Sequence, residues 1–331
     1  MGFMCRRAAS LLLAAALVAG ASVGCSNGNE SAAPQATATA TPEATPAPSA
    51  SASAPTIPAG KAPEQSFAVG VRQLKLNRDG DRPLPVRVWY PAVGRSGGKP
   101  ATGVDAADGR FPVVMFSHGL GGRPADYETL LTRWAAAGFV VAAPTFPHTS
   151  GTDQPNVLDV LNQPADVSYV LTEVLALDGR DGDPLRGHLA TDRVAATGHS
   201  AGGVTTIGLF TTRRDERLAA GIVFAGTALG VGTAFAGAAA PQLFVHGEAD
   251  EVVQYAAGKA VYDAVPWPKA MLSLPDGDHG RALLGNGTSL RVVADTTIEF
   301  LRWTLYGDST AKDRIATAAA RDDVATLDNN L

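Results

Sequence analysis

A serine between two glycines, Ser200, is the side chain of this sequence whose setting most clearly suggests covalent chemistry. Residues 198–202 read Gly-His-Ser-Ala-Gly, with a short β-like run at residues 193–197 before them and a helix-like run at residues 204–213 after them. Gly-x-Ser-x-Gly between a strand and a helix is typical of a nucleophile elbow, a sharp turn that holds a serine hydroxyl above the end of a sheet. Glycines flank the serine because the strand and the helix pass closely there. The alternative is a glycine-rich turn with an incidental serine.

A serine hydroxyl is a weak nucleophile at neutral pH and needs a histidine base that a carboxylate orients. In elbow enzymes the chain order is serine, acid, histidine. Only His246 and His279 follow Ser200. His279 lies in the loop 275–280 (PDGDHG), between a predicted strand and the last predicted helix, and is the predicted general base. His246 ends a predicted strand, where we expect it to pack and hydrogen-bond at the sheet margin.

The acid is expected in the loop after the preceding strand, and residues 246–250 (HGEAD) supply two candidates. Asp250 is favoured because the glycine and the short turn direct it back toward the end of the sheet. Glu248 is the substitute candidate. Asp276 and Asp278 are so close to the base in sequence that we expect them to cap its loop.

The transition state needs two N–H donors aimed at the developing oxyanion, each worth roughly 3 kcal/mol of barrier. The residue after the nucleophile, Ala201, supplies one from the start of the helix. The other is expected in the turn 117–122 (SHGLGG), which follows a predicted strand. Flanking glycines indicate the Leu120 N–H, and the His118 side chain is expected to brace that turn.

A long segment at residues 144–164 has no clear period and is rich in Pro, Thr and Asp. Loops of this length are often functional. We predict that Phe146, His148 and Asn156 contribute to the acyl or alcohol pocket. No large cap insertion is evident, so an open site for small or short-chain esters is expected.

Alternating strands and helices must position these groups. Buried or alternating apolar patterns predict strands at residues 71–76, 86–90, 111–116, 139–143, 193–197, 219–224, 243–245 and 270–274. Helical patterns fall at residues 127–137, 165–177, 204–213, 256–264 and 290–305. This order predicts an α/β fold with a mostly parallel central sheet, helices on both faces and no large cap domain. In such sheets ligands bind beyond the carboxyl ends of the strands, where the motif residues fall.

The composition narrows the function classes. The chain has 331 residues, 45% of them hydrophobic, and a formal charge of −5, which argues against nucleic acid as a partner. Its two cysteines, Cys5 and Cys25, both precede residue 26, so cysteine catalysis is excluded for the globular part. The six histidines show no ligand-like spacing, so no metal site and no cofactor are expected. We expect a monomer.

The amino terminus is typical of an export signal. Two arginines precede an apolar run that is shorter than the roughly 20 residues of a membrane span. The run ends at residues 22–26 (SVGCS), which resembles a bacterial lipobox with Cys25 as the lipidated residue; plain secretion is the alternative. We predict a lipoprotein-type signal at 1–24, a disordered tether rich in Ala, Thr, Pro and Ser at 25–65, a catalytic domain at 66–306 and a polar tail at 307–331. The protein would be anchored by lipid to the outside of the cell membrane, or secreted.

Residues 74–305 resemble the α/β-hydrolase superfamily. Within them, residues 82–91 (RPLPVRVWYP), 116–122 (FSHGLGG) and 163–167 (QPADV) are similar to the group containing platelet-activating-factor acetylhydrolases and dienelactone-hydrolase-like esterases. The resemblance implies a serine esterase with the α/β-hydrolase fold, the triad Ser200, Asp250 and His279, and oxyanion donors at Leu120 and Ala201. True dienelactone hydrolases carry cysteine where this chain has serine.

The leading hypothesis is an exported, metal-free hydrolase of small-molecule or lipid-like carboxylic esters that works through an acyl-enzyme. A polyester hydrolase on the same plan is one alternative, and an amidase or peptidase is another. A non-catalytic surface lipoprotein that keeps the fold for binding is a third.

Overall fold

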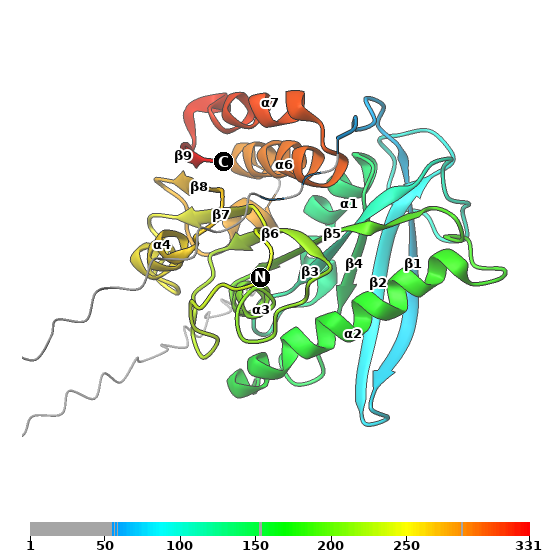
Figure 1. Cartoon of the computed structure of the whole chain (residues 1–331), viewed down its shortest axis with the longest axis horizontal. Helices are drawn as coiled ribbons and strands as arrows, with labels where there is room; N and C mark the ends of the chain where they lie inside the picture. Colours follow the sequence, from blue (N-terminus) through cyan, green and yellow to red (C-terminus); the bar gives the residue numbers. More distant parts are fainter. Residues whose placement is uncertain (1–54, 56, 58, 152–153, 286) are drawn as a thin grey trace, which may run out of the picture. The chain divides into compact units, whose positions relative to one another are not determined.

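The computed structural model describes residues 55, 57, 59–151, 154–285 and 287–331 (Figure 1). The predicted signal, the Cys25 lipidation site and most of the predicted tether lie outside the described residues. In the described part of the chain, no helix is long and apolar enough to cross a membrane.

The strands of the described chain form one sheet in the order β1-β2-β4-β3-β5-β6-β7-β8-β9. The strands from β4 to β8 in this order are parallel, whereas β1, β2 and β9 pair antiparallel with their neighbours. The predicted mostly parallel sheet is therefore confirmed. Their bounds are β1 (Ala68–Arg78), β2 (Arg82–Ala92), β3 (Phe111–Ser117), β4 (Val140–Pro144), β5 (Leu189–His199), β6 (Leu218–Phe224), β7 (Gln242–Gly247), β8 (Lys269–Leu274) and β9 (Thr326–Asn330).

Helices cover both faces of this sheet, as predicted. The helices α2 (Gln163–Leu175), α3 (Ala201–Gly208) and α4 (Tyr255–Ala264) contribute to one apolar cluster. The helices α1 (Glu128–Ala136), α6 (Thr288–Leu301) and α7 (Ser309–Ala319) contribute to the other, and Figure 1 shows α6 and α7 side by side. Short helical turns complete the connections: α5 (Arg281–Leu284), η1 (Pro124–Tyr127), η2 (Val157–Asn162), η3 (Ala176–Gly179), η4 (Arg302–Tyr306) and η5 (Arg321–Asp323).

The central strands are apolar because both of their faces are covered. Every residue of β3 (FPVVMFS) is buried, and β4 is buried throughout as well. A strand packed on two helical layers has no solvent-facing side, so its sequence is a continuous apolar run. β1 lies at the sheet edge, and over residues 73–78 its exposed positions alternate with buried or half-buried ones. No large cap domain interrupts the elements of the described chain.

The chain around the predicted catalytic domain is more ordered than expected. Residues 307–331, expected as a polar tail, form α7, which buries Ala311 and Ile315, and β9, which pairs with β8. Asp308 caps α7 by accepting hydrogen bonds from the Thr310 and Ala311 N–H groups at 3.1 and 3.3 Å. Ala62, in the predicted tether, is buried and its N–H donates to Asp308 at 3.4 Å. The folded unit therefore extends beyond residues 66–306 on both sides.

Candidate active site

Ser200 stands at a strained turn between the end of β5 and the start of α3. Its φ and ψ are 56° and −117°, a left-handed conformation that a residue with a side chain rarely adopts. Its N–H donates to the Phe224 carbonyl at 2.9 Å, which fixes the turn against β6. A Cβ at Gly198 would lie 2.1 Å from the Gly202 carbonyl oxygen, and one at Gly202 would lie 2.0 Å from that of Ser117. Both glycines are thus required for steric reasons, and the local geometry is that of a nucleophile elbow.

A continuous hydrogen-bonded chain joins the three predicted triad residues. The His279 Nε2 lies 2.8 Å from the Ser200 Oγ, and its Nδ1 lies 2.8 Å from the Asp250 Oδ2. A neutral imidazole that donates from Nδ1 to a carboxylate has a free lone pair on Nε2. Nε2 can therefore accept the serine proton in this arrangement.

The Asp250 carboxylate is completely buried but well satisfied. Its Oδ1 accepts hydrogen bonds from the Val252 and Val253 N–H groups, both at 2.8 Å. The His246 Nε2 lies 3.4 Å from its Oδ2 and donates to the Val253 carbonyl at 2.8 Å. Burial opposes ionisation of Asp250, but these donors and His279 outweigh it and hold its pKa far below the usual value. The alternative acid, Glu248, is exposed and makes no described contact with His279.

Gly247 and Gly277 allow two loops to pack closely. The loop after β7 carries Asp250 and is called the acid loop, and the loop after β8 carries His279 and is called the base loop. A Cβ at Gly247 would lie 2.2 Å from the Gly277 carbonyl oxygen. That same oxygen accepts a hydrogen bond from the Ala249 N–H at 3.0 Å. Within the base loop, the Asp278 Oδ1 accepts a hydrogen bond from the Gly280 N–H at 3.2 Å, which matches the capping role expected for it. The loops thus meet beside the elbow although they are separated in sequence.

The predicted oxyanion donors flank Ser200. A Cβ at Gly119 would lie 3.3 Å from the Ser200 Cβ, so the turn that carries Leu120 lies against Ser200. The Leu120 N–H has no acceptor among the described residues. Ala201 is the first residue of α3, where a backbone N–H has no intrahelical partner. Both donors are therefore available to a ligand beside the hydroxyl.

His118 braces this turn, as expected. Its ring accepts a hydrogen bond at Nε2 from the Phe146 N–H (3.2 Å), and its Nδ1 lies 2.8 Å from the Gly119 carbonyl oxygen. Burial lowers the pKa of His118 and keeps it neutral. A neutral ring that accepts at Nε2 donates from Nδ1, so the side chain ties the turn to the segment after β4.

Of the predicted pocket residues after β4, the structure encloses Phe146 in the core and leaves His148 exposed. Phe146 is fully buried against the His118 ring and so is not available to a substrate. It extends the apolar cluster on the α2 side of the sheet, which explains its burial. His148 is exposed, with no described contact to Ser200 or His279. The Asn156 side chain accepts from the Leu158 N–H at 3.1 Å and begins η2.

Two residues that the sequence pattern does not single out, His199 and Tyr127, lie beside Ser200. His199 is buried, with its Nδ1 at 2.8 Å from the Tyr127 hydroxyl and its Nε2 at 2.6 Å from the His279 carbonyl oxygen. The Tyr127 hydroxyl also accepts a hydrogen bond from the Gly119 N–H at 3.1 Å. The signal for His199 was its place beside the serine, whereas nothing in the sequence paired it with Tyr127.

Two of the segments that carry the resemblance meet in a buried ion cluster. The Arg82 guanidinium binds the Asp166 carboxylate at 2.6 to 2.8 Å and the Asp159 carboxylate at 2.8 to 2.9 Å. Arg78 lies 3.1 Å from Oδ1 of Asp166, an oxygen that Arg82 also binds. This cluster fastens η2 and α2 to the β1–β2 hairpin and lies outside the triad.

A hollow of about 710 Å³ opens beside His279. Its lining combines the base loop, the acid loop and two exposed apolar side chains: Ala249, Glu251, Val252, Asp278, His279, Gly280, Leu284 and Gly285.

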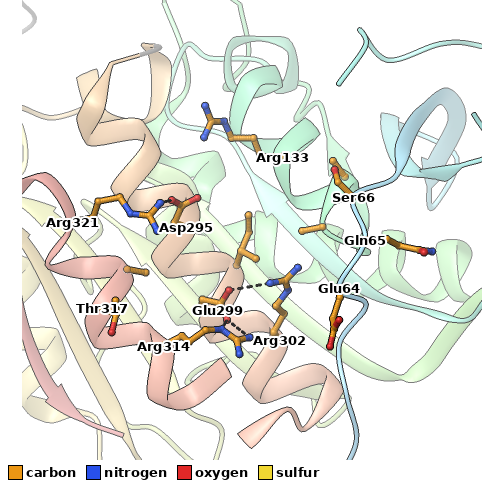
Figure 2. A pocket seen from close by; sticks show the side chains of 14 residues that line it. Glu64, Gln65, Ser66, Arg133, Asp295, Glu299, Arg302, Arg314, Thr317 and Arg321 are labelled. Carbon is orange, nitrogen blue, oxygen red and sulfur yellow. Dashed lines mark hydrogen bonds and ion pairs between the residues drawn. The ribbon is translucent and has the colours of Figure 1, made fainter. Parts of the chain in front are cut away.

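A second hollow of about 430 Å³ lies between α1, α6 and α7, and Figure 2 shows its charged walls. There Glu299 lies between Arg302 (3.0 Å) and Arg314 (2.9 Å), and this hollow contains none of the triad residues. Only the first hollow adjoins the hydrogen-bonded triad.

No group of three or more metal-ligating side chains is found in the described part of the chain. A water or substrate near Ser200 would meet the His279 imidazole and the Leu120 and Ala201 N–H groups.

Comparison with known proteins gives one partial match. Residues 101–233 match the family model described as Chlorophyllase, a family of esterases similar to α/β hydrolases. The matched segment contains Leu120, Ser200 and Ala201 but neither Asp250 nor His279. A search of curated proteins finds no match. The chain therefore has the α/β-hydrolase fold, and its partial match is to a family of ester-hydrolysing enzymes with that fold.

Proposed function

We propose that this protein is a serine esterase that hydrolyses carboxylic esters through an acyl-enzyme. The observation that carries the proposal is the chain Asp250–His279–Ser200, with 2.8 Å at each step, at a serine with a positive φ. Three side chains of these types in this order are the constellation that activates a serine hydroxyl. The partial match to esterases supports the choice of substrate bond.

In the first half of the reaction, His279 Nε2 takes the proton from the Ser200 hydroxyl as its oxygen attacks the ester carbonyl carbon. The carbonyl π electrons move to its oxygen, which accepts hydrogen bonds from the Leu120 and Ala201 N–H groups. The tetrahedral intermediate collapses and the bond to the alcohol oxygen breaks. The imidazolium, held by Asp250, returns the proton to the leaving alcohol.

In the second half, a water molecule takes the place of the alcohol. His279 accepts a proton from the water as its oxygen attacks the acyl carbon of the acyl-serine. The second intermediate expels the Ser200 oxygen, which regains its proton from His279. Acid and free serine enzyme are the products, so one water is consumed per ester bond.

The hollow beside His279 supports the proposed substrate class. Val252 and Leu284 are 62% and 50% exposed, so they offer an apolar wall to one part of the ester. The absence of a large cap among the described elements suits short-chain or lipid-like esters that enter from solvent. Closer kinship with the platelet-activating-factor acetylhydrolase group is part of the proposal and rests on the sequence segments quoted above.

We further propose that the enzyme is exported and held at the outer side of the cell membrane through a lipid on Cys25. The amino-terminal sequence alone supports this. In this setting the enzyme acts as a monomer on exogenous or envelope esters, needs no cofactor and binds no nucleic acid.

The test is hydrolysis of a chain-length series of p-nitrophenyl esters by the wild type, Ser200→Ala and Ser66→Ala. Ser66 is an exposed serine outside the site and serves as the matched control. We expect Ser200→Ala to lower kcat by on the order of 10⁵-fold without unfolding, and a fluorophosphonate to label only the wild type and the control. Amino-acid p-nitroanilides, run in parallel, test the amidase alternative. Turnover that survives in Ser200→Ala would overturn the mechanism, and no turnover of any ester by the wild type would favour a non-catalytic protein.

A further inference from the structure

A buried hydrogen-bonded relay runs behind the nucleophile and touches three separate parts of the site. It begins at the Gly119 N–H, passes through Tyr127 and His199, and ends at the His279 carbonyl. These contacts span 3.1, 2.8 and 2.6 Å in that order. The relay thus links the turn that carries the oxyanion donor, the elbow and the base loop.

The direction of every hydrogen bond in the relay is determined. A carbonyl oxygen only accepts, so His199 Nε2 must carry a proton and donate to the His279 carbonyl. The neutral ring then has only a lone pair at Nδ1, so the Tyr127 hydroxyl donates to it. The lone pairs of that hydroxyl accept from the Gly119 N–H. No donor or acceptor of the relay is left without a partner, which is the condition under which a buried polar network is stable.

The chemical state of both side chains suits this role. His199 is fully buried, and burial, followed by the nearby His279, lowers its pKa to about 4. Burial raises the pKa of Tyr127 to about 12. Both groups are therefore neutral over the range in which an imidazole base works. Neither residue lines the hollow beside His279, so we assign neither a proton transfer with a substrate.

The fit around Gly119 is tight. A Cβ at this glycine would lie 3.2 Å from the His199 Nδ1, 3.2 Å from the Tyr127 hydroxyl and 3.3 Å from the Ser200 Cβ. The turn therefore rests directly on the relay and on the nucleophile. A shift of either relay side chain moves the neighbouring Leu120 N–H relative to the place where the oxyanion forms.

We propose that Tyr127 and His199 are positioning residues that hold the oxyanion turn and the His279 loop at fixed places relative to Ser200. The proposal rests on the serine esterase function above. On this proposal the relay lowers the free energy of the transition state. It does so because the oxyanion donors that it positions interact with charge that develops only there. Ground-state binding of the ester should depend little on it.

The first test is Tyr127→Phe, which removes one hydroxyl and leaves the ring. Tyr306→Phe is the matched control, because Tyr306 is also buried and its hydroxyl donates to the Gly138 carbonyl, away from the site. With active sites counted by fluorophosphonate, we expect kcat of Tyr127→Phe to fall about tenfold with KM within twofold of wild type. Affinity for phenylboronic acid, whose serine adduct occupies the oxyanion position, should fall in parallel.

The second test replaces the histidine. His199→Gln keeps one donor and one acceptor and should retain kcat within about threefold, whereas His199→Leu removes both and should match Tyr127→Phe. Rescue by glutamine separates a hydrogen-bonding role from a packing role.

Three outcomes overturn the proposal: unchanged kcat per active site in Tyr127→Phe, the same loss in Tyr306→Phe, or equal activity of the glutamine and leucine variants. If Tyr127→Phe does not fold, the histidine pair decides alone. Any of these results, with Ser200→Ala still inactive, removes the relay but leaves the esterase assignment intact.

Discussion

Two buried carboxylates in this molecule have opposite kinds of partner. Asp166 is held by two arginines, with Arg82 as close as 2.6 Å and Arg78 at 3.1 Å. Asp250 is held by two histidines, with His279 at 2.8 Å and His246 at 3.4 Å. Both carboxylates are completely shielded from solvent. The two sites thus differ in what the partner can do with a proton.

The arginine-held site cannot take part in proton transfer. The hydrogen bonds that Arg82 donates to Asp166 raise the pKa of Arg82 further above its already high value, so the guanidinium stays charged. Burial raises the pKa of Asp166 in spite of these partners. The histidine-held site differs, because a neutral imidazole has a lone pair that can accept a proton, whereas a guanidinium has none. The first arrangement fastens chain segments, and the second can support a reaction.

The largest expected effect comes from Asp250→Asn. An asparagine amide can donate to His279 Nδ1, which would place the proton on Nε2 and prevent it from accepting the serine proton. We expect kcat to fall by about 10³- to 10⁴-fold with a small change in KM, measured with a p-nitrophenyl ester. Glu248→Gln, in the same loop but exposed, is the control and should keep wild-type kcat. A mild loss in Asp250→Asn would show that the carboxylate is structural, like Asp166.

A smaller effect, on stability alone, is expected from Asp166→Asn. This substitution removes one of the two carboxylates that bind the largely buried Arg82. Breaking a buried ion pair lowers the free energy of unfolding by about 3 kcal/mol. Urea denaturation should show this loss, while kcat per titrated active site remains close to wild type. Asp79→Asn, which removes an 81% exposed partner of Arg78, should change stability by less than about 0.5 kcal/mol. A large loss of kcat would mean that the ion cluster also positions the catalytic loops.

The smallest expected effect is a pH dependence of the free energy of unfolding that arises from His199, next to the histidine-held site. The unfolded chain binds a proton at His199 below pH 6.5, whereas the folded chain resists protonation down to about pH 4. The unfolded state therefore holds more protons in this window, and the free energy of unfolding falls as the pH decreases through it. The expected loss at pH 5 relative to neutral pH is about 2 kcal/mol from this residue.

Urea denaturation of the wild type and His199→Gln at pH 7.5 and pH 5 checks this expectation. The variant lacks the titrating group, so its loss between the two pH values should be smaller by that amount. Equal losses in the two proteins would mean that His199 is protonated in the folded state.

The parts of the fold and site that could be predicted have local signatures. Continuous apolar runs located the central strands, because a strand covered on both faces carries no polar position. Ser200 is marked by its glycines. The order serine, acid, histidine of elbow enzymes, together with the loops after the later strands, indicated the acid and the base. Asp250 and His279 could thus be named before their contact was known.

What could not be predicted depends on tertiary register. Tyr127 and His199 are 72 residues apart in sequence, and neither pattern indicates the other. Phe146 lies in a loop of the kind that often lines a pocket, but the path of the chain after β4 directs its side chain into the core. β9 (TLDNN) pairs with β8 through its backbone, so its polar side chains gave no strand pattern.

The positive φ of Ser200 means that stability and activity favour different residues at position 200. Glycine adopts that backbone conformation without strain, so its introduction would relieve about 1 kcal/mol while deleting the hydroxyl that the proposed reaction needs. Selection for survival at high temperature, without an assay for product, should therefore accumulate inactive proteins with glycine at residue 200.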